Sequence, residues 1–111
     1  MKTIKVGICG LGTVGAGTAQ MLQKNAATIQ KRTGIDIRVT KAATIDPYEH
    51  LDIDFSQITV SQSVDDILND PKIDVVVELI GGDGLAKQII LQAFENGKSV
   101  VTANKALLAK H

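Results

Sequence analysis

Six residues near the start of the chain have the spacing of a phosphate-binding loop. They fit the pattern G-x-G-x-x-G and read Gly10-Leu11-Gly12-Thr13-Val14-Gly15. In this pattern Gly10 permits a tight turn, Gly12 leaves room for a pyrophosphate, and Gly15 lets a helix pack closely on a strand. The amides of Thr13, Val14 and Gly15 would then bind a diphosphate at the positive end of a helix. The alternative is a glycine-rich turn that binds nothing.

An acid at the end of the second strand would bind the ribose hydroxyls of a dinucleotide. Asp46 is the candidate, although a plain Asp-Pro turn explains it equally well. Ile45 is apolar, and residues 43–71 contain no Lys or Arg, so a 2′-phosphate would lack a cation nearby. Lys41 is the nearest base that could reach this site. We therefore expect NAD(H) to be favoured over NADP(H).

Two loops that follow strands are expected to meet the nicotinamide end, because ligands bind beyond the carboxyl ends of parallel strands. The cofactor contacts expected there are Ile80, Gly81, Thr102, Ala103 and Lys105. Lys105 is also the candidate catalytic residue. Hydride transfer at a carbinol carbon needs a proton on or off the oxygen, and a lysine can supply it. The alternative is one more solvated lysine.

Two unusual residues lie within apolar strands. Glu78 interrupts the run at 73–80, and a buried acid needs hydrogen-bond donors. We expect it to hydrogen-bond and organise the neighbouring loops, which we favour over direct catalysis. Cys9 is the single cysteine, so it forms no internal disulfide, and it is expected to be buried and inert. The chain therefore suits a reducing compartment, the cytoplasm.

The apolar patterns predict strands that alternate with helices. The strands expected are 4–9, 35–45, 58–60, 73–80 and 99–102, and the helices 13–33, 63–70, 85–96 and 106–110. Apolar residues recur at helical spacing in two of these helices: Val14, Met21, Leu22, Ala26 and Ile29 in the first, and Leu85, Ile89, Ala93 and Phe94 in the third. Residues 48–62 are expected to form an exposed excursion. The order predicts an α/β fold, a Rossmann-type doubly wound parallel sheet with helices on both faces.

Length and charge exclude several classes of function. A chain of 111 residues has the size of one domain, and 44% apolar with 22% charged residues is typical of a soluble globular protein. Twelve basic and twelve acidic side chains cancel, so there is no basic excess for binding nucleic acid. No apolar run reaches the roughly 18 residues of a membrane span. We also expect no metal site.

Three blocks of sequence carry a family resemblance: residues 10–15, 76–82 and 97–109. The third is the most specific, because it contains T-A-N-K-A-L-L-A at 102–109. Together they resemble the amino-terminal half of homoserine dehydrogenase. This family interconverts aspartate 4-semialdehyde and L-homoserine with NAD(P)H, on the route to threonine, methionine and isoleucine. The resemblance implies that Lys105 is the family lysine implicated in proton transfer and in contact with cofactor and substrate.

The resemblance also carries departures and alternatives. Ile45 stands where many members carry Arg, and the loop at Asp83-Gly84 differs from the common pattern. The family's substrate and dimerisation domain is absent from residues 1–111, so we expect a truncated cofactor domain, inactive alone, of a homo-oligomeric enzyme. A sugar-oxidoreductase-like dehydrogenase and a non-catalytic NAD(H)-sensing regulatory domain are the alternatives. The first would usually read Glu-Lys-Pro near Lys105, which this chain does not.

Overall fold

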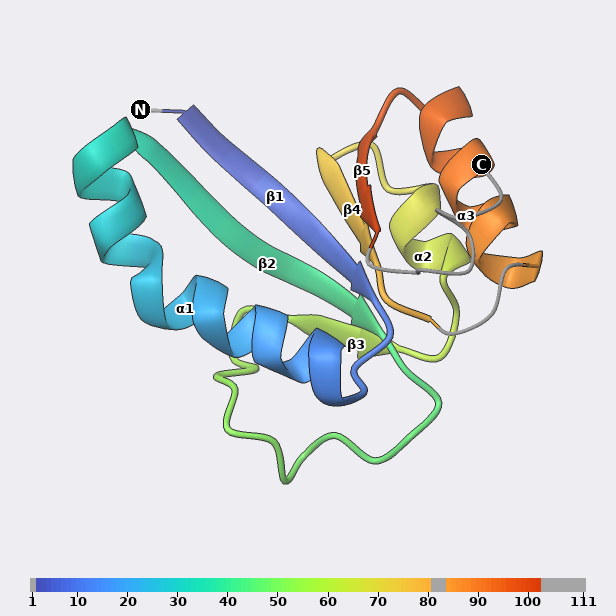
Figure 1. Cartoon of the computed structure of the whole chain (residues 1–111), viewed down its shortest axis with the longest axis horizontal. Helices are drawn as coiled ribbons and strands as arrows, with labels where there is room; N and C mark the ends of the chain where they lie inside the picture. Colours follow the sequence, from blue (N-terminus) through green and yellow to red (C-terminus); the bar gives the residue numbers. More distant parts are fainter. Residues whose placement is uncertain (1, 81–83, 103–111) are drawn as a thin grey trace.

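The computed structural model describes residues 2–80 and 84–102 as one parallel sheet with helices (Figure 1). Its elements are β1 (Lys2–Cys9), α1 (Thr13–Thr33), β2 (Ile35–Ala43), β3 (Thr59–Ser61), α2 (Asp65–Leu68), β4 (Val75–Glu78), α3 (Gly84–Glu95) and β5 (Ser99–Thr102). The strands lie in the order β3-β2-β1-β4-β5, and each neighbouring pair is parallel. This is the strand order of the Rossmann fold, so the predicted fold class is confirmed.

Helices cover both faces of the sheet, and each face has its own apolar core. On one face, Ala16 and Ala19 of α1 pack with Val6, Ile8 and Val39. On the other face α2 and α3 bury a second cluster, which comprises Cys9, Ala43, Ile67, Leu68, Ile73, Val76, Ile89 and Ala93. Figure 1 shows α1 running along β2, with α2 and α3 beside β4 and β5. The two cores hold the carboxyl ends of β1, β2 and β4 in one row.

Helix α1 has the predicted bounds but buries a different side. Gly34 ends it in the left-handed conformation with φ 74°, and its amide bonds to the carbonyl of Gln30, as the stop signal indicated. The apolar spacing predicted the helix correctly, although Val14 and Met21 are 58% and 50% exposed and Leu22, Ala26 and Ile29 are part-buried. The residues buried instead are small: Gly15, Ala16 and Ala19. Small residues let the helix backbone approach the sheet closely.

Strand β2 ends earlier than the predicted residue 45. The amide of Asp46 donates to the hydroxyl of Thr44 at 3.2 Å, and this local turn leads the chain away from the sheet before Pro47. Ile45 is consequently 81% exposed. The shorter strand places Thr44, Ile45 and Asp46 on the loop beyond the carboxyl end of β2, where a ligand of a parallel sheet binds.

A bulge in β2 changes which face its last residues occupy. Val6 pairs with Val39, but Gly7 pairs with Lys41, so Thr40 is passed over. Lys41 then shares the α2 face with Gly7 instead of entering the core under α1. There its ammonium donates to the main-chain carbonyl of Asp66 at 3.0 Å and pairs with the Asp70 carboxylate at 3.0 Å.

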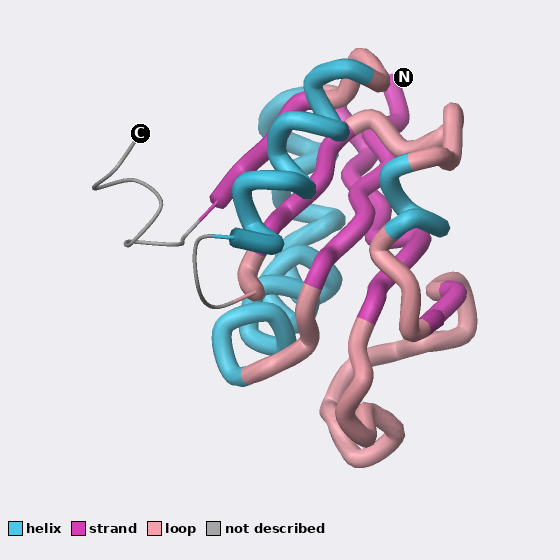
Figure 2. Tube along the Cα trace, turned by 90° about the vertical axis from the view of Figure 1, so that its right-hand side faces the viewer, coloured by secondary structure: helices cyan, strands magenta, loops and turns pink. Residues whose placement is uncertain are grey.

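The connection between β2 and β3 was expected to be an exposed excursion, and this is partly wrong. Figure 2 shows it projecting beyond the strands, and Glu49, His50, Asp52 and Asp54 are exposed. Its apolar residues nevertheless pack on the α1 core, namely Tyr48, Leu51, Ile53, Phe55 and Ile58. Tyr48 contacts Phe55 with ring centroids 5.1 Å apart. Alternate apolar residues thus anchor this long loop.

The second half of the chain follows the prediction with shorter elements. Strand β4 covers four residues of the predicted run at 73–80, although Ile73 before it is buried. Helix α3 buries Ala86 together with Ile89 and Ala93 of the expected stripe, whereas the stripe's other members, Leu85 and Phe94, are exposed. The predicted helix at 106–110 lies outside the described residues. None of the helices described is long and apolar enough to cross a membrane.

Candidate functional site

The glycine loop turns sharply between β1 and α1. Gly10 has φ 102°, a conformation that L side chains rarely adopt, and its amide donates to the carbonyl of Ala43 at 2.8 Å. This bond ties the turn to the end of β2. The predicted role of Gly10 in a tight turn is therefore in agreement with its backbone.

Gly15 and Gly12 have different surroundings. A β-carbon on Gly15 would stand 1.9 Å from the carbonyl oxygen of Gly10, so only glycine fits there. A β-carbon on Gly12 would meet nothing within 4 Å. Gly12 also has φ −69° and ψ −166°, an extended conformation open to any residue. The turn itself therefore does not require glycine at position 12, whereas a ligand seated against the loop would.

The first turn of α1 presents unbonded amides beside this open space. The helix ladder begins with the bond from the Ala16 amide to the carbonyl of Gly12 at 2.8 Å. The amides of Thr13, Val14 and Gly15 precede it and have no partner within the helix. With a 21-residue helix behind them, they form a site suited to an anion.

A cleft of about 530 Å³ lies against the glycine loop, above the carboxyl ends of the strands. Its lining comes from residues 10–12, 43–46 and 62–64, together with Leu79, Ile80 and Leu85. The walls of the cleft are mainly apolar, because they are formed by Leu11, Ile45, Val64, Leu79, Ile80 and Leu85. Such walls suit a stacked heterocycle. Asp46 is the one charged side chain among the described residues that line it. The cleft thus fits the adenosine and diphosphate portions of a dinucleotide.

A smaller cavity of about 360 Å³ adjoins the other side of the same loop. It is lined by Gly12, Thr13 and Asp46, and by His50 and Leu51 of the β2–β3 connection. Asp46 therefore lies between the two spaces, close to the helix start. This position is compatible with the predicted contact between its carboxylate and ribose hydroxyls. The local turn before Pro47 is present as well, so the alternative role of Asp46 as a turn residue stays open.

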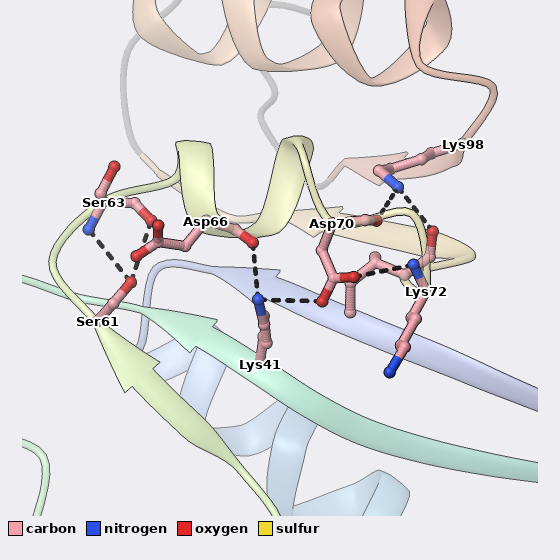
Figure 3. A network of polar contacts seen from close by, with 8 residues as sticks. Lys41, Ser61, Ser63, Asp66, Asp70, Lys72 and Lys98 are labelled. Atoms are coloured by element: carbon pink, nitrogen blue, oxygen red, sulfur yellow. Dashed lines mark hydrogen bonds and ion pairs between the residues drawn. The ribbon is translucent and has the colours of Figure 1, made fainter.

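Lys41 does not turn toward the cleft. Figure 3 shows its ammonium between Asp66 and Asp70, below α2. The carboxylate of Asp70 also accepts the amide of Lys72 at 2.9 Å, and these donors hold the pKa of Asp70 below its usual value. Lys41 is thus engaged elsewhere, and the described part of the cleft contains no basic side chain.

Glu78 lies at the carboxyl end of β4 with none of its surface exposed. One carboxylate oxygen accepts the Ile80 amide at 2.7 Å, and the other accepts the Thr102 hydroxyl at 2.8 Å. The expected hydrogen-bonded role is thereby confirmed. Cys9 faces the same interior, and its burial, followed by the charge of Glu78, raises the pKa of the thiol to about 12. Cys9 is buried, as predicted.

The other predicted site residues divide by where they fall. Leu11 and Ile80 line the cleft, and Thr102 is held by Glu78. Gly81, Ala103 and Lys105 lie outside the described residues. Residues 62–64 and Leu85 also line the cleft and were not predicted. No local sequence pattern marks them for binding, because only the folding of the chain brings them to the cleft. The described Cys, His, Asp and Glu side chains form no group of three suited to a metal ion.

Comparisons with known proteins agree with this geometry. The family model of the homoserine dehydrogenase NAD-binding domain matches residues 10–111. The chain belongs to the homoserine dehydrogenase family. The homoserine dehydrogenase of Pseudomonas aeruginosa is 52% identical over 111 residues, which are 100% of this chain and 25% of that protein. That of Bacillus subtilis is 37% identical over 109 residues, 98% of this chain and 25% of that protein.

Solved structures of the family match the fold closely. The homoserine dehydrogenase of S. aureus has a TM-score of 0.89 at 35% identity, covering 100% of this chain and 28% of that one. The enzyme from Thiobacillus denitrificans has a TM-score of 0.87 at 46% identity, covering 99% of this chain and 25% of that one. Levoglucosan dehydrogenase in complex with NADH, at 18% identity and a TM-score of 0.74, shares the fold alone.

These matches decide between the functions that the sequence left open. The chain is an NAD-binding domain of the homoserine dehydrogenase family, and the sugar-oxidoreductase and sensor readings are not favoured. It spans about a quarter of the length of the curated relatives that it matches.

Proposed function

We propose that this chain is the cofactor domain of a longer homoserine dehydrogenase that interconverts aspartate 4-semialdehyde and L-homoserine. Family membership over the whole chain supports the reaction, and the quarter-length match supports a separate substrate domain. The observation that carries cofactor binding is the empty space at Gly12, beside three amides at the start of α1. A diphosphate seated there would explain a glycine that the turn does not need.

The residues of the cleft would divide the work of binding. The amides of Thr13, Val14 and Gly15 would hold the diphosphate, and Asp46 would accept the adenosine ribose hydroxyls. The nicotinamide half would extend past Leu79 and Ile80, toward the loops that follow β4 and β5. When bound, NAD(H) supplies or accepts the hydride.

Lys105 is the proposed proton carrier in this enzyme. It follows Thr102, the last residue of β5, by three positions in the sequence. A proton must leave the hydroxyl of homoserine as its carbon loses hydride, and return in the reverse direction. We assign that exchange to the Lys105 side chain, on the strength of the family motif at 102–109.

We further propose that NAD(H) is preferred to NADP(H). Asp46 is the charged group at the cleft, and Lys41 is paired with Asp70 instead. A 2′-phosphate close to Asp46 would meet a like charge with no described lysine or arginine to offset it. A cytoplasmic homo-oligomer is the accompanying expectation, with the oligomer formed through the substrate domain.

The test is an activity assay on the full-length polypeptide that carries this chain. We expect NAD-dependent oxidation of L-homoserine, followed by NADH absorbance, and weaker activity with NADP. The 111-residue chain alone should bind NADH by calorimetry and oxidise no homoserine, because the substrate groups are lacking and positioning supplies much of the rate. Full-length protein that binds NADH but leaves homoserine unchanged would contradict the proposed reaction.

A further inference from the structure

The carboxylate of Glu78 joins two loops that the proposed function places beside the nicotinamide. Glu78, the last residue of β4, is paired with Cys9 of β1 on one side and with Thr102 of β5 on the other. Its two oxygens accept one donor from each connection or its start: the amide of Ile80, which follows β4, and the hydroxyl of Thr102, the last residue of β5. With no exposed surface, Glu78 itself has no route to touch a ligand.

Burying this carboxylate is costly, which argues for a specific purpose. An ionised side chain loses its hydration in the interior and is normally paired with a cation. Among the described residues no basic side chain forms an ion pair with Glu78. An apolar residue would fill the core at lower cost, as Ile67 and Val76 do around it. What an apolar side chain would not supply is a directional link between Ile80 and Thr102.

We propose that Glu78 is a positioning residue, which holds the loops after β4 and β5 in register so that the nicotinamide and Lys105 meet the substrate correctly. The proposal rests on the proposed function, and it adds a residue that acts only through others. Lys105 follows Thr102 by only three positions in the sequence. A displacement of about 1 Å at reacting groups is enough to lower a rate roughly a hundredfold.

The same two strands carry a second link at their opposite ends, which provides a matched control. Lys98 stands immediately before β5 and is only 6% exposed. Its ammonium donates to the main-chain carbonyls of Asp70 and Ile73 in the connection that leads into β4 (Figure 3). Both links join the β4 and β5 regions, but only Glu78 does so at the edge where ligands bind.

The first measurement separates the two halves of the cofactor. ADP-ribose contains the adenosine and the diphosphate but lacks the nicotinamide. In the full-length protein we expect Glu78→Met, which removes both acceptors, and Thr102→Val to leave ADP-ribose affinity within about twofold of the wild type, because the glycine loop is untouched. NADH affinity should fall by roughly three- to tenfold, about the effect of one lost hydrogen bond. Equal losses for both ligands, or none for NADH, would overturn the proposal.

The second measurement is kinetic and uses a double-mutant cycle. Glu78→Met and Thr102→Val should each lower kcat for homoserine roughly ten- to hundredfold. The double variant should be no slower than the worse single variant, because both changes break one link. Thr102→Ser retains the hydroxyl and should recover most of the rate. Multiplicative losses would mean that the two residues act separately, and would overturn the proposal.

The control variant is Lys98→Met, which removes two hydrogen bonds at the other end of the strands and keeps the side-chain volume. It should lower the melting temperature and leave both kcat and the ratio of NADH to ADP-ribose affinity unchanged. If it lowers kcat as much as Glu78→Met does, the Glu78 link is merely structural. If the proposed function is wrong, the wild-type protein will not oxidise homoserine. The ratio of NADH to ADP-ribose affinity would still test the role of Glu78 in that case.

Discussion

The α-carbon of Gly15 lies so close to the Gly10 carbonyl that a β-carbon there would stand 1.9 Å from the oxygen. Two glycines of one motif therefore serve different purposes, since the corresponding position at Gly12 is open. Gly15 is needed by the folded chain itself, whereas Gly12 would be needed by the proposed diphosphate. This difference leads to a prediction that separates folding from binding.

Gly12→Val should fold normally and lose NADH binding, because its branched side chain would occupy the space beside the amides of α1. Gly15→Ala should destabilise the fold, because its methyl group collides with the main chain at Gly10. This cost should exceed the roughly 1 kcal/mol by which alanine's higher helix propensity stabilises a helix. Thermal melts and calorimetry on both variants check this. Unchanged NADH affinity in folded Gly12→Val would contradict the assignment of the diphosphate site.

Asp46 should set the choice between NADH and NADPH. Asp46→Ser removes the charge at the cleft, and we expect NADPH affinity to rise roughly tenfold, about 1.4 kcal/mol of relieved repulsion. The affinity for NADH should fall, because the ribose hydroxyls lose an acceptor. Asp52→Ser, an exposed acid of the same connection, is the control and should change neither. Tighter NADPH than NADH binding by the unsubstituted chain would show that the preference is wrong.

The Cys9 thiol should be unreactive in the folded chain. Burial and the charge of Glu78 raise its pKa to about 12, so at pH 8 only about one molecule in ten thousand carries the thiolate that attacks reagents. Labelling with an aromatic disulfide at pH 8 should therefore follow unfolding, and saturating NADH should slow it further. The urea-unfolded chain, which should react at once, is the control. Rapid labelling of native protein would refute the buried placement.

Asp70 should stabilise the fold at neutral pH and lose that effect in acid. Its pKa is lowered first by the Lys72 amide and then by Lys41. A carboxylate with a lowered folded-state pKa stabilises fully above its unfolded pKa of about 3.9, and the contribution disappears as pH falls through the folded value. Asp70→Asn should cost roughly 1 kcal/mol or less at pH 7.

The measurement for Asp70 is a series of urea melts from pH 7 down to pH 2. The difference between the wild type and Asp70→Asn should shrink below about pH 4, where the unfolded carboxyl takes up its proton. Asp66→Asn is the matched control, because Lys41 contacts Asp66 through its main-chain carbonyl. A difference in unfolding free energy that grows as the pH falls would contradict this prediction.

Lys105→Ala in the full-length protein should lower kcat roughly a hundredfold or more, the usual loss for a general acid or base. NADH affinity should change less, because the diphosphate loop is intact. Lys87→Ala, on the exposed side of α3, is the control and should retain full activity. Steady-state rates with homoserine and NAD decide it, and near-normal turnover of Lys105→Ala would remove the lysine from the mechanism.

Local signals allowed the glycine loop, the alternation of strands and helices, and the ends of α1 to be predicted. Gly10 and Gly34 indicated a tight turn and a helix end, and both have the positive φ that few other residues adopt. The buried side of α1 could not be predicted from apolarity, because the helix approaches the sheet through Ala16 and Ala19. Larger residues such as Met21 then remain outside.

Features that depend on distant parts of the chain were missed. Lys98 reads as an ordinary surface lysine, yet its ammonium is satisfied by carbonyls at Asp70 and Ile73, more than twenty positions earlier. The connection at 48–58 is polar enough to suggest an excursion, and only the packed core shows where its alternate apolar residues go. Ser63 and Val64 join the cleft for the same reason: parallel strands bring separate loops to one edge.

The bulge in β2 means that this strand tolerates the loss of one particular residue. Deleting Thr40 would leave Val39 paired with Val6 and Lys41 with Gly7, so every later side chain would keep its face and its partner. Deleting Val39 instead would bring the Thr40 hydroxyl into the core beneath α1. Insertions and deletions in this strand among relatives should therefore concentrate at Thr40. A change of length there would leave the residues at the carboxyl end of β2 in place.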